Sequence, residues 1–359
     1  MVFNMFKWAA LIAAAVVLPV ASAQAQVKTE EPPVVTGAAK VRIETVQVAS
    51  RGVAGNLLKT PAERDVIVIL PPSYDRQPRR RYPVVYALHG FSIGAAQWIR
   101  ELHIPATAEA AFATGTPEMI IVFPDSKNVY GGAFYTRSIV TGNFEGFIAD
   151  ELPDYIDRHY RTIARREARG LVGHSMGGYG TARIGSLRPD RFGAIYMMSP
   201  CCLTPMGVQG LTAKEVAEIA AFKAPQDVSG KPFMYQGALA TGAAFTPNPL
   251  KPPLYVDLPV DKDGQVLPDV MARRGANAPL AMLDQNVVNL RQYRAIAIDV
   301  GDQDSIAPTA TQLHQALLDY GIPNAFEVYA GTHTSKVAFR FRDHVLPFFG
   351  RAIAAQPAK

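Results

Sequence analysis

The chain is poor in cysteine, which excludes a fold that depends on disulfide cross-links. Two of the 359 residues are cysteine, and they are neighbours, Cys201 and Cys202. Adjacent cysteines cannot join distant segments, because their Cα atoms lie closer together than those of ordinary disulfides. Two interpretations stay open: the pair provides two small buried hydrophobic side chains, or it forms a strained vicinal disulfide.

The chain also lacks a large excess of charge of either sign. The net charge is +5, and the basic residues are scattered apart from Arg79, Arg80 and Arg81. No stripe of basic and aromatic residues accompanies that run, so we expect no nucleic-acid partner. With 48% hydrophobic and 19% charged residues, the composition is that of a globular protein that buries a sizeable core.

Long hydrophobic runs are few, and the clearest one lies in the first 25 residues. Lys7 precedes an apolar run over residues 9–20, and two small-x-small sequences follow within residues 21–25. This pattern is typical of a cleaved signal peptide, so residues 1–25 predict a periplasmic or secreted protein. A membrane anchor is the alternative, but the run is short for a bilayer span. We expect residues 26–40 to be a flexible lead-in and the mature protein to bind no membrane.

Residues 171–180 place one serine between glycines, after a short apolar strand and before a helix. Gly173 and Gly177 flank Ser175 in the spacing G-x-S-x-G. This spacing is typical of a nucleophile elbow, a turn that is too tight for side chains on either flank. The helix that follows would direct N–H groups and its positive dipole end at an oxyanion. The motif predicts that Ser175 is a nucleophile, with a plain structural turn as the alternative.

Strand-like and helix-like segments alternate over residues 41–350, which predicts one α/β domain with a doubly wound, mostly parallel sheet and helices on both faces. Residues 351–359 would form a tail. The expected strands cover residues 41–48, 65–70, 82–88, 119–123, 171–172, 194–198, 294–300 and 326–329. The expected helices cover residues 104–114, 147–160, 175–188, 211–222, 279–290, 309–320 and 336–349.

This alternation is broken over residues 203–290, after the sixth strand, where a proline-rich run separates two expected helices. A segment of this length between two strands is normally an elaborated insertion. At this point of the sheet it would lie over the carboxyl edge, where ligands bind. We interpret it as a cap that shapes the acyl or alcohol pocket. A surface excursion without a role in binding is the alternative.

A serine nucleophile needs a base and an acid, which follow the serine along the chain in nucleophile-elbow proteins. Of the seven histidines, His333 lies in a loop of small residues directly after the last expected strand, so we expect it to be the base. The acid should follow the strand at 294–300, where Asp299, Asp302 and Asp304 are candidates. We favour Asp304, with Asp302 as the alternative, to orient the imidazole.

Two backbone N–H groups are expected to form an oxyanion hole. One belongs to Met176, directly after the serine. The other belongs to Phe91, because Gly90 lets the loop after the third strand turn inward. We expect His89 to order this loop.

Taken together, these motifs resemble those of an esterase family in the α/β-hydrolase superfamily. The family includes S-formylglutathione hydrolases, feruloyl esterases, enterochelin esterase-like proteins and mycolyltransferases of the antigen 85 type. The motifs are residues 70–74, 88–90 with Trp98, 134–136, 173–180, 189–192 and His333, in family order. The resemblance implies the α/β-hydrolase fold, Ser175 as nucleophile, Asp304 as acid, His333 as base, and Phe91 and Met176 as oxyanion donors.

Two features depart from members of this family. Arg137 follows the aromatic-Tyr-Thr motif, where mycolyltransferases carry an acidic residue. Their triad acid is also a glutamate, so both points argue against mycolyl transfer. Export argues against S-formylglutathione hydrolysis, which belongs to the cytoplasm.

The sequence therefore predicts an exported serine carboxylic ester hydrolase that acts through an acyl-enzyme, with no metal and no cofactor. We expect a small-molecule or carbohydrate-linked ester, or an aromatic acyl ester, as the substrate. Phe134, Tyr135 and Tyr179 lie in motifs near the nucleophile and are candidate substrate-binding residues, together with His89. The alternatives are an acyltransferase of the mycolyltransferase type, a serine peptidase and a non-catalytic binding protein of the same fold.

Overall fold

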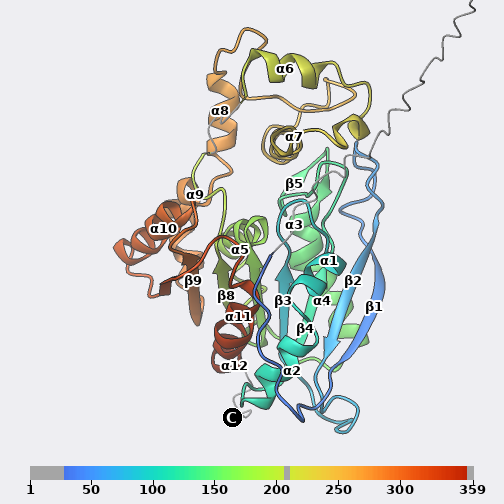
Figure 1. The fold of residues 1–359 in the computed structure, drawn as a ribbon, viewed down its shortest axis with the longest axis vertical. Helices are drawn as coiled ribbons and strands as arrows, with labels where there is room; N and C mark the ends of the chain where they lie inside the picture. The colour runs from blue at the N-terminus through green and yellow to red at the C-terminus, as the bar shows by residue number, and fades with distance from the viewer. Residues whose placement is uncertain (1–27, 206–210, 354–359) are drawn as a thin grey trace, which may run out of the picture.

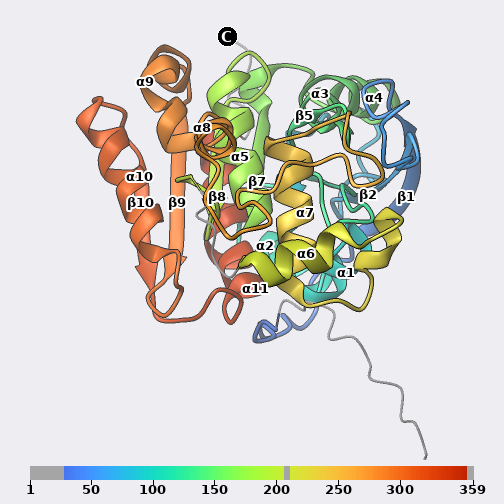
Figure 2. The same cartoon turned by 90° about the horizontal axis from the view of Figure 1, so that it is seen from above.

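The described part of the chain is built around a central β-sheet of eight strands. A computed structural model describes residues 28–205 and 211–353. The strand order is β1-β2-β4-β3-β7-β8-β9-β10 (Figures 1 and 2). β2 pairs antiparallel with β1 and β4, and the other neighbours pair in parallel. The prediction of a mostly parallel sheet is confirmed.

The strands of this sheet are β1 (Arg42–Ala49), β2 (Glu63–Leu70), β3 (Val84–Leu88), β4 (Ile120–Pro124), β7 (Arg169–His174), β8 (Ala194–Met198), β9 (Ala295–Gly301) and β10 (Ala325–Tyr329). β5 (Arg137–Ser138) and β6 (Gly142–Asn143) form a separate pair. The α-helices are α1 (Ala95–Glu101), α2 (Ala106–Ala113), α3 (Phe144–Gly146), α4 (Leu152–His159), α5 (Met176–Leu187), α6 (Ala213–Ala220), α7 (Phe233–Phe245), α8 (Pro268–Gly275), α9 (Pro279–Leu290), α10 (Ala307–Asp319), α11 (Val337–Arg340) and α12 (Leu346–Ala352). Two short 3₁₀ segments are η2 (Arg166–Ala168) and η3 (Pro225–Val228).

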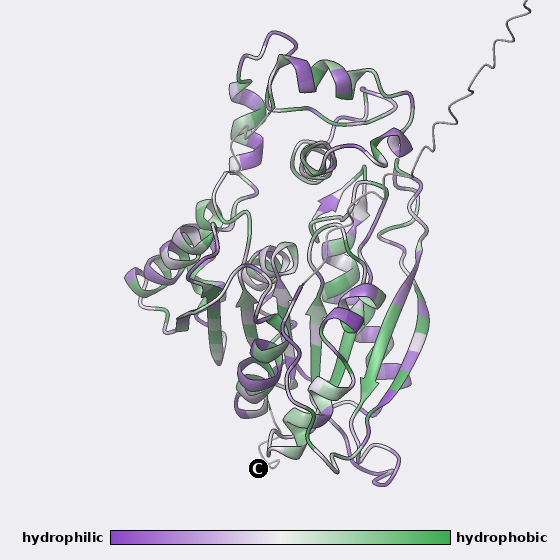
Figure 3. Cartoon of the chain, in the orientation of Figure 1, coloured by the Kyte–Doolittle hydropathy of each residue, from purple (hydrophilic) through white to green (hydrophobic). Residues whose placement is uncertain are grey.

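Side chains of the central strands alternate between two hydrophobic cores. In β2, Val66, Val68 and Leu70 belong to one core, whereas Ile67 and Ile69 belong to the other. Strands covered on both faces show this pattern, because successive side chains point to opposite faces. Helices α4, α5, α9 and α10 contribute to the first core, and α1, α2, α11 and α12 contribute to the second. Figure 3 shows hydrophobic residues along these central strands.

Two helices that the sequence predicts as continuous contain a π turn. The π turn η1 (Phe147–Glu151) precedes α4, and the π turn η4 (Phe341–Val345) separates α11 from α12. A single π turn shifts the helical period locally, which a sequence pattern does not resolve. The sequence pattern also does not predict α1, α7 and α8. Residues 238–245 of α7 are all buried, so this helix lacks the one-sided apolar stripe by which helices are recognised.

Within the insertion predicted over residues 203–290, helices α6, α7 and α8 lie over the carboxyl ends of the parallel strands, whereas α9 packs against α5 (Figure 1). Its helix α7 contacts the loops of the sheet domain. Ser138 donates its hydroxyl to the carbonyl oxygen of Ala243 at 2.6 Å, and the rings of Phe134 and Phe245 pack with centroids 5.2 Å apart. α6 lies farther from the sheet, and α8 leads back toward α9 (Figure 1). The role of the insertion as a cap stays a prediction.

The start of the described chain runs along the body of the protein. The N–H of Glu30 donates to the carbonyl oxygen of Ser335 at 2.8 Å, and Lys40 pairs with Glu109 at 2.9 Å. Both contacts involve residues of the segment predicted as a flexible lead-in, and its flexibility stays a prediction. The predicted signal peptide and most of the predicted tail lie outside the described residues. Among the described residues, none of the helices has the length and apolarity needed to span a bilayer.

Candidate active site

Ser175 lies at the sharp turn between the end of β7 and the start of α5. Its φ angle is +58°, a region that is strained for a residue with a side chain. A Cβ atom on Gly177 would lie 2.0 Å from the carbonyl oxygen of Leu88. A Cβ atom on Gly173 would lie 2.2 Å from the carbonyl group of Gly177. Only glycine fits at both flanking positions, which is the steric requirement of a nucleophile elbow.

Ser175, His333 and Asp304 form a continuous chain of hydrogen bonds. His333 Nδ1–H donates to Asp304 Oδ2 at 2.6 Å, and the Ser175 hydroxyl donates to His333 Nε2 at 2.9 Å. Because a carboxylate only accepts, the proton lies on Nδ1 and the Nε2 lone pair faces the serine. The His333 side chain is 37% exposed, whereas that of Asp304 is 2% exposed. The imidazole is therefore accessible to a ligand while the carboxylate beneath it is not.

Of the three candidate aspartates, the structure brings Asp304 to His333. Asp302 accepts a hydrogen bond from the N–H of Gly331 at 2.9 Å and so holds the loop that carries His333. Asp299 lies buried in β9 and accepts from Arg340 Nε at 2.7 Å. Asp302 and Asp299 thus have structural partners of their own.

The environment of Asp304 keeps its carboxyl group ionised. Burial alone would raise the pKa of Asp304, but the hydrogen bond and charge of His333 and the N–H of Ile306 lower it below its ordinary value. The carboxylate is therefore available at neutral pH to stabilise a positively charged imidazole.

His174 precedes the serine in the chain, so it is not a candidate for the catalytic base. In the structure it contacts the loop of His333. Its Nε2–H donates to the carbonyl oxygen of His333 at 2.8 Å, and the two ring centroids lie 4.8 Å apart. Burial, followed by the neighbouring His333, lowers the pKa of His174 to about 3. His174 is therefore neutral and fixes the backbone of its neighbour. The place of His174 directly before Ser175 indicates that it lies at the elbow, but it does not indicate which group its side chain contacts.

The loop after β3 lies against the nucleophile elbow. A Cβ atom on Gly90 would lie 3.6 Å from Cβ of Ser175, so the N–H of the next residue, Phe91, belongs to a loop beside the serine. Met176 is the first residue of α5, and a helix leaves the N–H groups of its first turn without an internal partner. Both expected oxyanion donors thus belong to backbone next to Ser175.

His89 and Tyr135 support this loop from the protein interior. His89 Nε2 accepts from the N–H of Ser126 at 2.9 Å, so its Nδ1–H donates to the carbonyl oxygen of Gly90 at 2.8 Å. The Tyr135 hydroxyl donates to the carbonyl oxygen of His89 at 2.9 Å. Burial lowers the pKa of His89, so the ring is neutral. Both side chains are fully buried, which places them behind the loop.

An aromatic cluster connects the elbow to the insertion. The rings of Phe134, Tyr179 and Phe245 pack with centroids 5.2 to 5.9 Å apart. Phe91 contacts Phe134 on one side and Phe233, at the start of α7, on the other. Phe134 and Tyr179 are buried, whereas Phe233 is 60% exposed and Phe91 is partly exposed. Phe91 and Phe233 are therefore the members of this cluster that a ligand could reach.

Cys201 and Cys202 adjoin the elbow as free, partly exposed thiols. The N–H of Cys201 donates to the carbonyl oxygen of Ser175 at 3.2 Å. The pair is thus neither fully buried nor joined by a disulfide in this structure. Within residues 28–205 and 211–353, no three His, Cys, Asp or Glu side chains are grouped in a way that could bind a metal ion.

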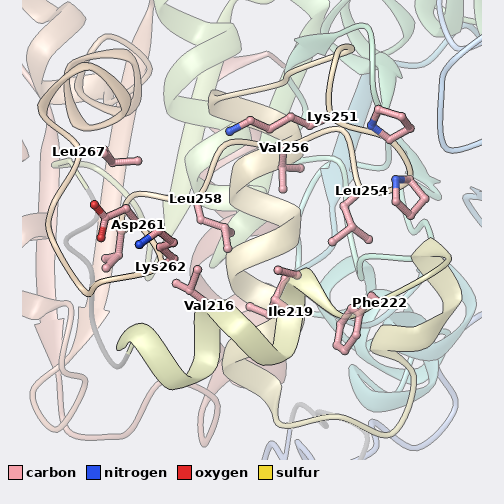
Figure 4. A pocket seen from close by; sticks show the side chains of 14 residues that line it. Val216, Ile219, Phe222, Lys251, Leu254, Val256, Leu258, Asp261, Lys262 and Leu267 are labelled. Atoms are coloured by element: carbon pink, nitrogen blue, oxygen red, sulfur yellow. The ribbon is translucent and has the colours of Figure 1, made fainter.

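A separate apolar cavity of about 380 Å³ lies within the insertion (Figure 4). α6 contributes Val216 and Ile219 to its wall, the turn after α6 contributes Phe222, and the loop over residues 251–267 contributes Leu254 and Leu258. Ser175, Asp304 and His333 do not line it. This cavity is therefore distinct from the candidate active site.

The fold resembles that of known esterases. A solved ferulic acid esterase has a TM-score of 0.61 and 22% sequence identity, covering 88% of this chain and 98% of that one. At this identity the likeness shows the fold, which is the α/β-hydrolase fold. A shared fold does not by itself assign an activity.

The chain belongs to the Esterase family, described as "Putative esterase", whose model matches residues 59–343. A stretch of 122 residues is 32% identical to Esterase Rv1288 of Mycobacterium tuberculosis, covering 33% of this chain and 25% of that relative. A stretch of 130 residues is 31% identical to an endo-1,4-beta-xylanase/feruloyl esterase of Xylanibacter ruminicola, covering 35% of this chain and 18% of that relative. The matched part spans a quarter or less of these relatives. The family resemblance drawn from the sequence motifs is confirmed.

Proposed function

We propose that this protein hydrolyses carboxylic esters through an acyl-enzyme on Ser175, with His333 as general base and Asp304 as the residue that orients the imidazole. The observation that carries the proposal is the chain of hydrogen bonds from Ser175 through His333 to Asp304, at 2.9 and 2.6 Å. Membership of an esterase family supports the same reaction class.

In this mechanism, the Ser175 oxygen attacks the ester carbonyl carbon while His333 Nε2 takes the hydroxyl proton. The N–H groups of Phe91 and Met176 stabilise the resulting oxyanion. His333 then returns the proton to the departing alcohol, which leaves an acyl group on Ser175. A water molecule, deprotonated by the same nitrogen, attacks the acyl group and releases the acid.

The proposed substrates are carbohydrate-linked or aromatic acyl esters. The Xylanibacter relative is named as a feruloyl esterase, and the similar solved structure is a ferulic acid esterase. Phe91 and Phe233 offer accessible rings beside the elbow, against which an aromatic acyl group could pack. A comparison of kcat/KM for the feruloyl ester and the acetyl ester of the same sugar tests this specificity.

The proposed site of action is the periplasm or the extracellular medium, from the leader-like sequence of residues 1–25. N-terminal sequencing of the protein recovered from these fractions tests this proposal. A chain that begins near Gln24 or Gln26 is expected, and a full-length chain retained in the cytoplasm would contradict it.

The reaction itself is tested with purified protein and p-nitrophenyl butyrate. We expect release of p-nitrophenol by the wild type and none above background by Ser175→Ala. Product analysis with an added sugar alcohol distinguishes hydrolysis from acyl transfer, because a transferase would yield the new ester in place of butyrate. A folded wild-type protein that hydrolyses no ester would contradict the proposal.

A further inference from the structure

Arg274 is a buried arginine with few partners. It lies in the last turn of α8 and is 4% exposed. A guanidinium group carries five N–H donors. In the described part of the chain, Arg274 donates to one group, the hydroxyl of Thr241 on α7, at 3.2 Å. Its buried Nε–H has no hydrogen-bond partner.

The other buried arginines of the described chain differ from Arg274, because each has a carboxylate partner. All are between 4 and 7% exposed. These ion pairs are Arg64 with Asp125, Arg169 with Asp157, and Arg340 with Asp299 and Glu327. No acidic residue pairs with Arg274 in residues 28–205 and 211–353, and the remaining segments of the sequence contain no Asp or Glu.

Arg274 nevertheless remains a cation at neutral pH. Burial lowers the pKa of Arg274 to about 10, while the nearby Cys202 acts in the opposite direction. A buried charge is costly unless an opposite charge or hydrogen bonds compensate it. Among the described residues, the guanidinium has one neutral hydroxyl as its hydrogen-bond partner, and its buried Nε–H has none.

Arg274 is linked to the candidate active site through intermediate residues. Cys202 is near enough to Arg274 to raise the pKa of the guanidinium, and it follows Cys201, whose N–H donates to the carbonyl oxygen of Ser175 at 3.2 Å. α8 leads directly to Asn277, whose carbonyl oxygen accepts from the Tyr179 hydroxyl at 2.9 Å. Tyr179 lies one turn after Ser175 in α5. Two short paths of contacts thus join the serine to the end of α8.

We propose that Arg274 binds an anionic oxygen group of the substrate, so that the preferred esters carry a carboxylate or another oxyanion in addition to the ester bond. This inference rests on the proposed ester hydrolysis. A guanidinium group forms two parallel hydrogen bonds with a carboxylate or a phosphate, and these charge-assisted bonds are stronger than neutral ones. A ligand that supplies such a group would complete the partners that the chain does not provide.

The test compares matched neutral and anionic esters. Mono-p-nitrophenyl glutarate against p-nitrophenyl butyrate places the charge in the acyl part, and 4-acetoxybenzoate against phenyl acetate places it in the alcohol part. For one of these pairs, we expect Arg274→Met to lower the anionic-to-neutral ratio of kcat/KM roughly 10- to 100-fold. The loss should fall mainly on KM, and Arg274→Lys should recover part of it.

Arg273→Met is the matched control. It removes the same charge from the same helix, but Arg273 is paired with Asp257 at 2.6 Å and its side chain is 45% exposed. We expect this variant to keep the wild-type ratio. A ratio that stays unchanged in Arg274→Met for both ester pairs, or that falls equally in Arg273→Met, would overturn the inference.

A binding measurement keeps the inference testable without turnover. We expect glutarate to raise the melting temperature of the wild type and of Arg273→Met, but not that of Arg274→Met. Without glutarate, Arg274→Met should melt at or above the wild-type temperature, because it removes an uncompensated buried charge. No glutarate effect on the wild type, or a strongly destabilised Arg274→Met, would indicate a purely structural arginine. Glutarate binding without hydrolysis of any ester would instead contradict the proposed reaction and support the anion site.

Discussion

The candidate site joins two regions that are positioned in different ways: the carboxyl edge of the sheet and the insertion over residues 203–290. Phe91, Ser175, Asp304 and His333 each follow the end of a parallel strand, so the strand order itself brings them to one edge. Arg274 comes from the insertion, whose helices are positioned by side-chain contacts with the loops of the sheet domain and with α5. We infer that the sheet edge determines the reaction and that the insertion determines the choice of substrate.

The largest expected effect comes from removing the base at the sheet edge. His333→Ala should lower kcat for p-nitrophenyl butyrate on the order of 10⁵-fold, because Ser175 would lose its proton acceptor. His314→Gln is the control, since His314 stacks on Phe326 with ring centroids 4.5 Å apart and bonds to Asn324, outside the site. We expect its kcat to remain within about threefold of the wild type. Equal losses in both variants would contradict a distinct role for His333.

The next largest effect separates the two aspartates of the loop after β9. Asp304→Asn should lower kcat roughly 10³- to 10⁴-fold, because an amide no longer fixes the Nδ1–H tautomer or stabilises the imidazolium. Asp302→Asn keeps a carbonyl oxygen that can accept the Gly331 N–H, so its kcat should change less than about tenfold. The reverse order of losses would assign the acid to Asp302.

A smaller effect is expected from two buried tyrosines in the loop after β4. Their hydroxyl groups donate to backbone carbonyl groups that lie in different regions, one at the sheet edge and one in the insertion. Tyr135 bonds to His89 in the loop beside Ser175 at 2.9 Å, and Tyr130 bonds to Leu254 in the insertion at 3.1 Å. Both Phe variants should lower the free energy of unfolding by about 1 kcal/mol. Tyr135→Phe should also lower kcat for p-nitrophenyl acetate about three- to tenfold, whereas Tyr130→Phe should not. A similar kcat for Tyr135→Phe and Tyr130→Phe would show that the Tyr135 hydroxyl is not needed to position the loop beside Ser175.

The smallest effect concerns an ion pair of the insertion. Burial alone would raise the pKa of Asp257, but hydrogen bonds from Lys251, Arg273 and Asn248 lower it from 3.8 to about 2. A lowered pKa means that the carboxylate stabilises the fold above its ordinary pKa, and that this contribution is lost as the pH falls toward about 2.

Asp257→Asn should therefore lower the melting temperature at pH 7 by a few degrees, roughly 2 to 4 °C. The difference from the wild type should shrink as the pH falls from about 4 to about 2. The kcat for p-nitrophenyl acetate at pH 7 should stay near that of the wild type, because the ion pair lies in the insertion. Melting curves over this pH range check the prediction, and a difference that grows toward low pH would contradict it.

The sheet and its edge could be predicted from the sequence, because their signals are local. The strand β8 has the expected bounds, since a short continuous apolar run has few alternatives. The elbow at Ser175 could be recognised because sterics demand Gly173 and Gly177. The choice between Asp302 and Asp304 could not be settled, because loop residues follow no periodic rule that indicates where their side chains point.

The insertion was less predictable, for physical reasons. α7 is buried along most of its length and shows no amphipathic stripe. Arg274 looks like any charged residue at the end of a helix, because burial and the absence of a carboxylate partner are properties of the folded chain. The contact between His174 and the carbonyl group of His333 likewise joins residues 159 positions apart, which no sequence spacing reveals.

The most direct test of the central claim is to identify the residue that an activated-serine reagent modifies. Intact-mass and peptide measurements after treatment with a fluorophosphonate should find one adduct per chain, on the peptide that contains Ser175. The adduct should be absent from Ser175→Ala and should form far more slowly in His333→Ala, because the hydroxyl needs its base. A folded wild-type protein that leaves Ser175 unmodified, or that carries the adduct on another residue, would contradict the account.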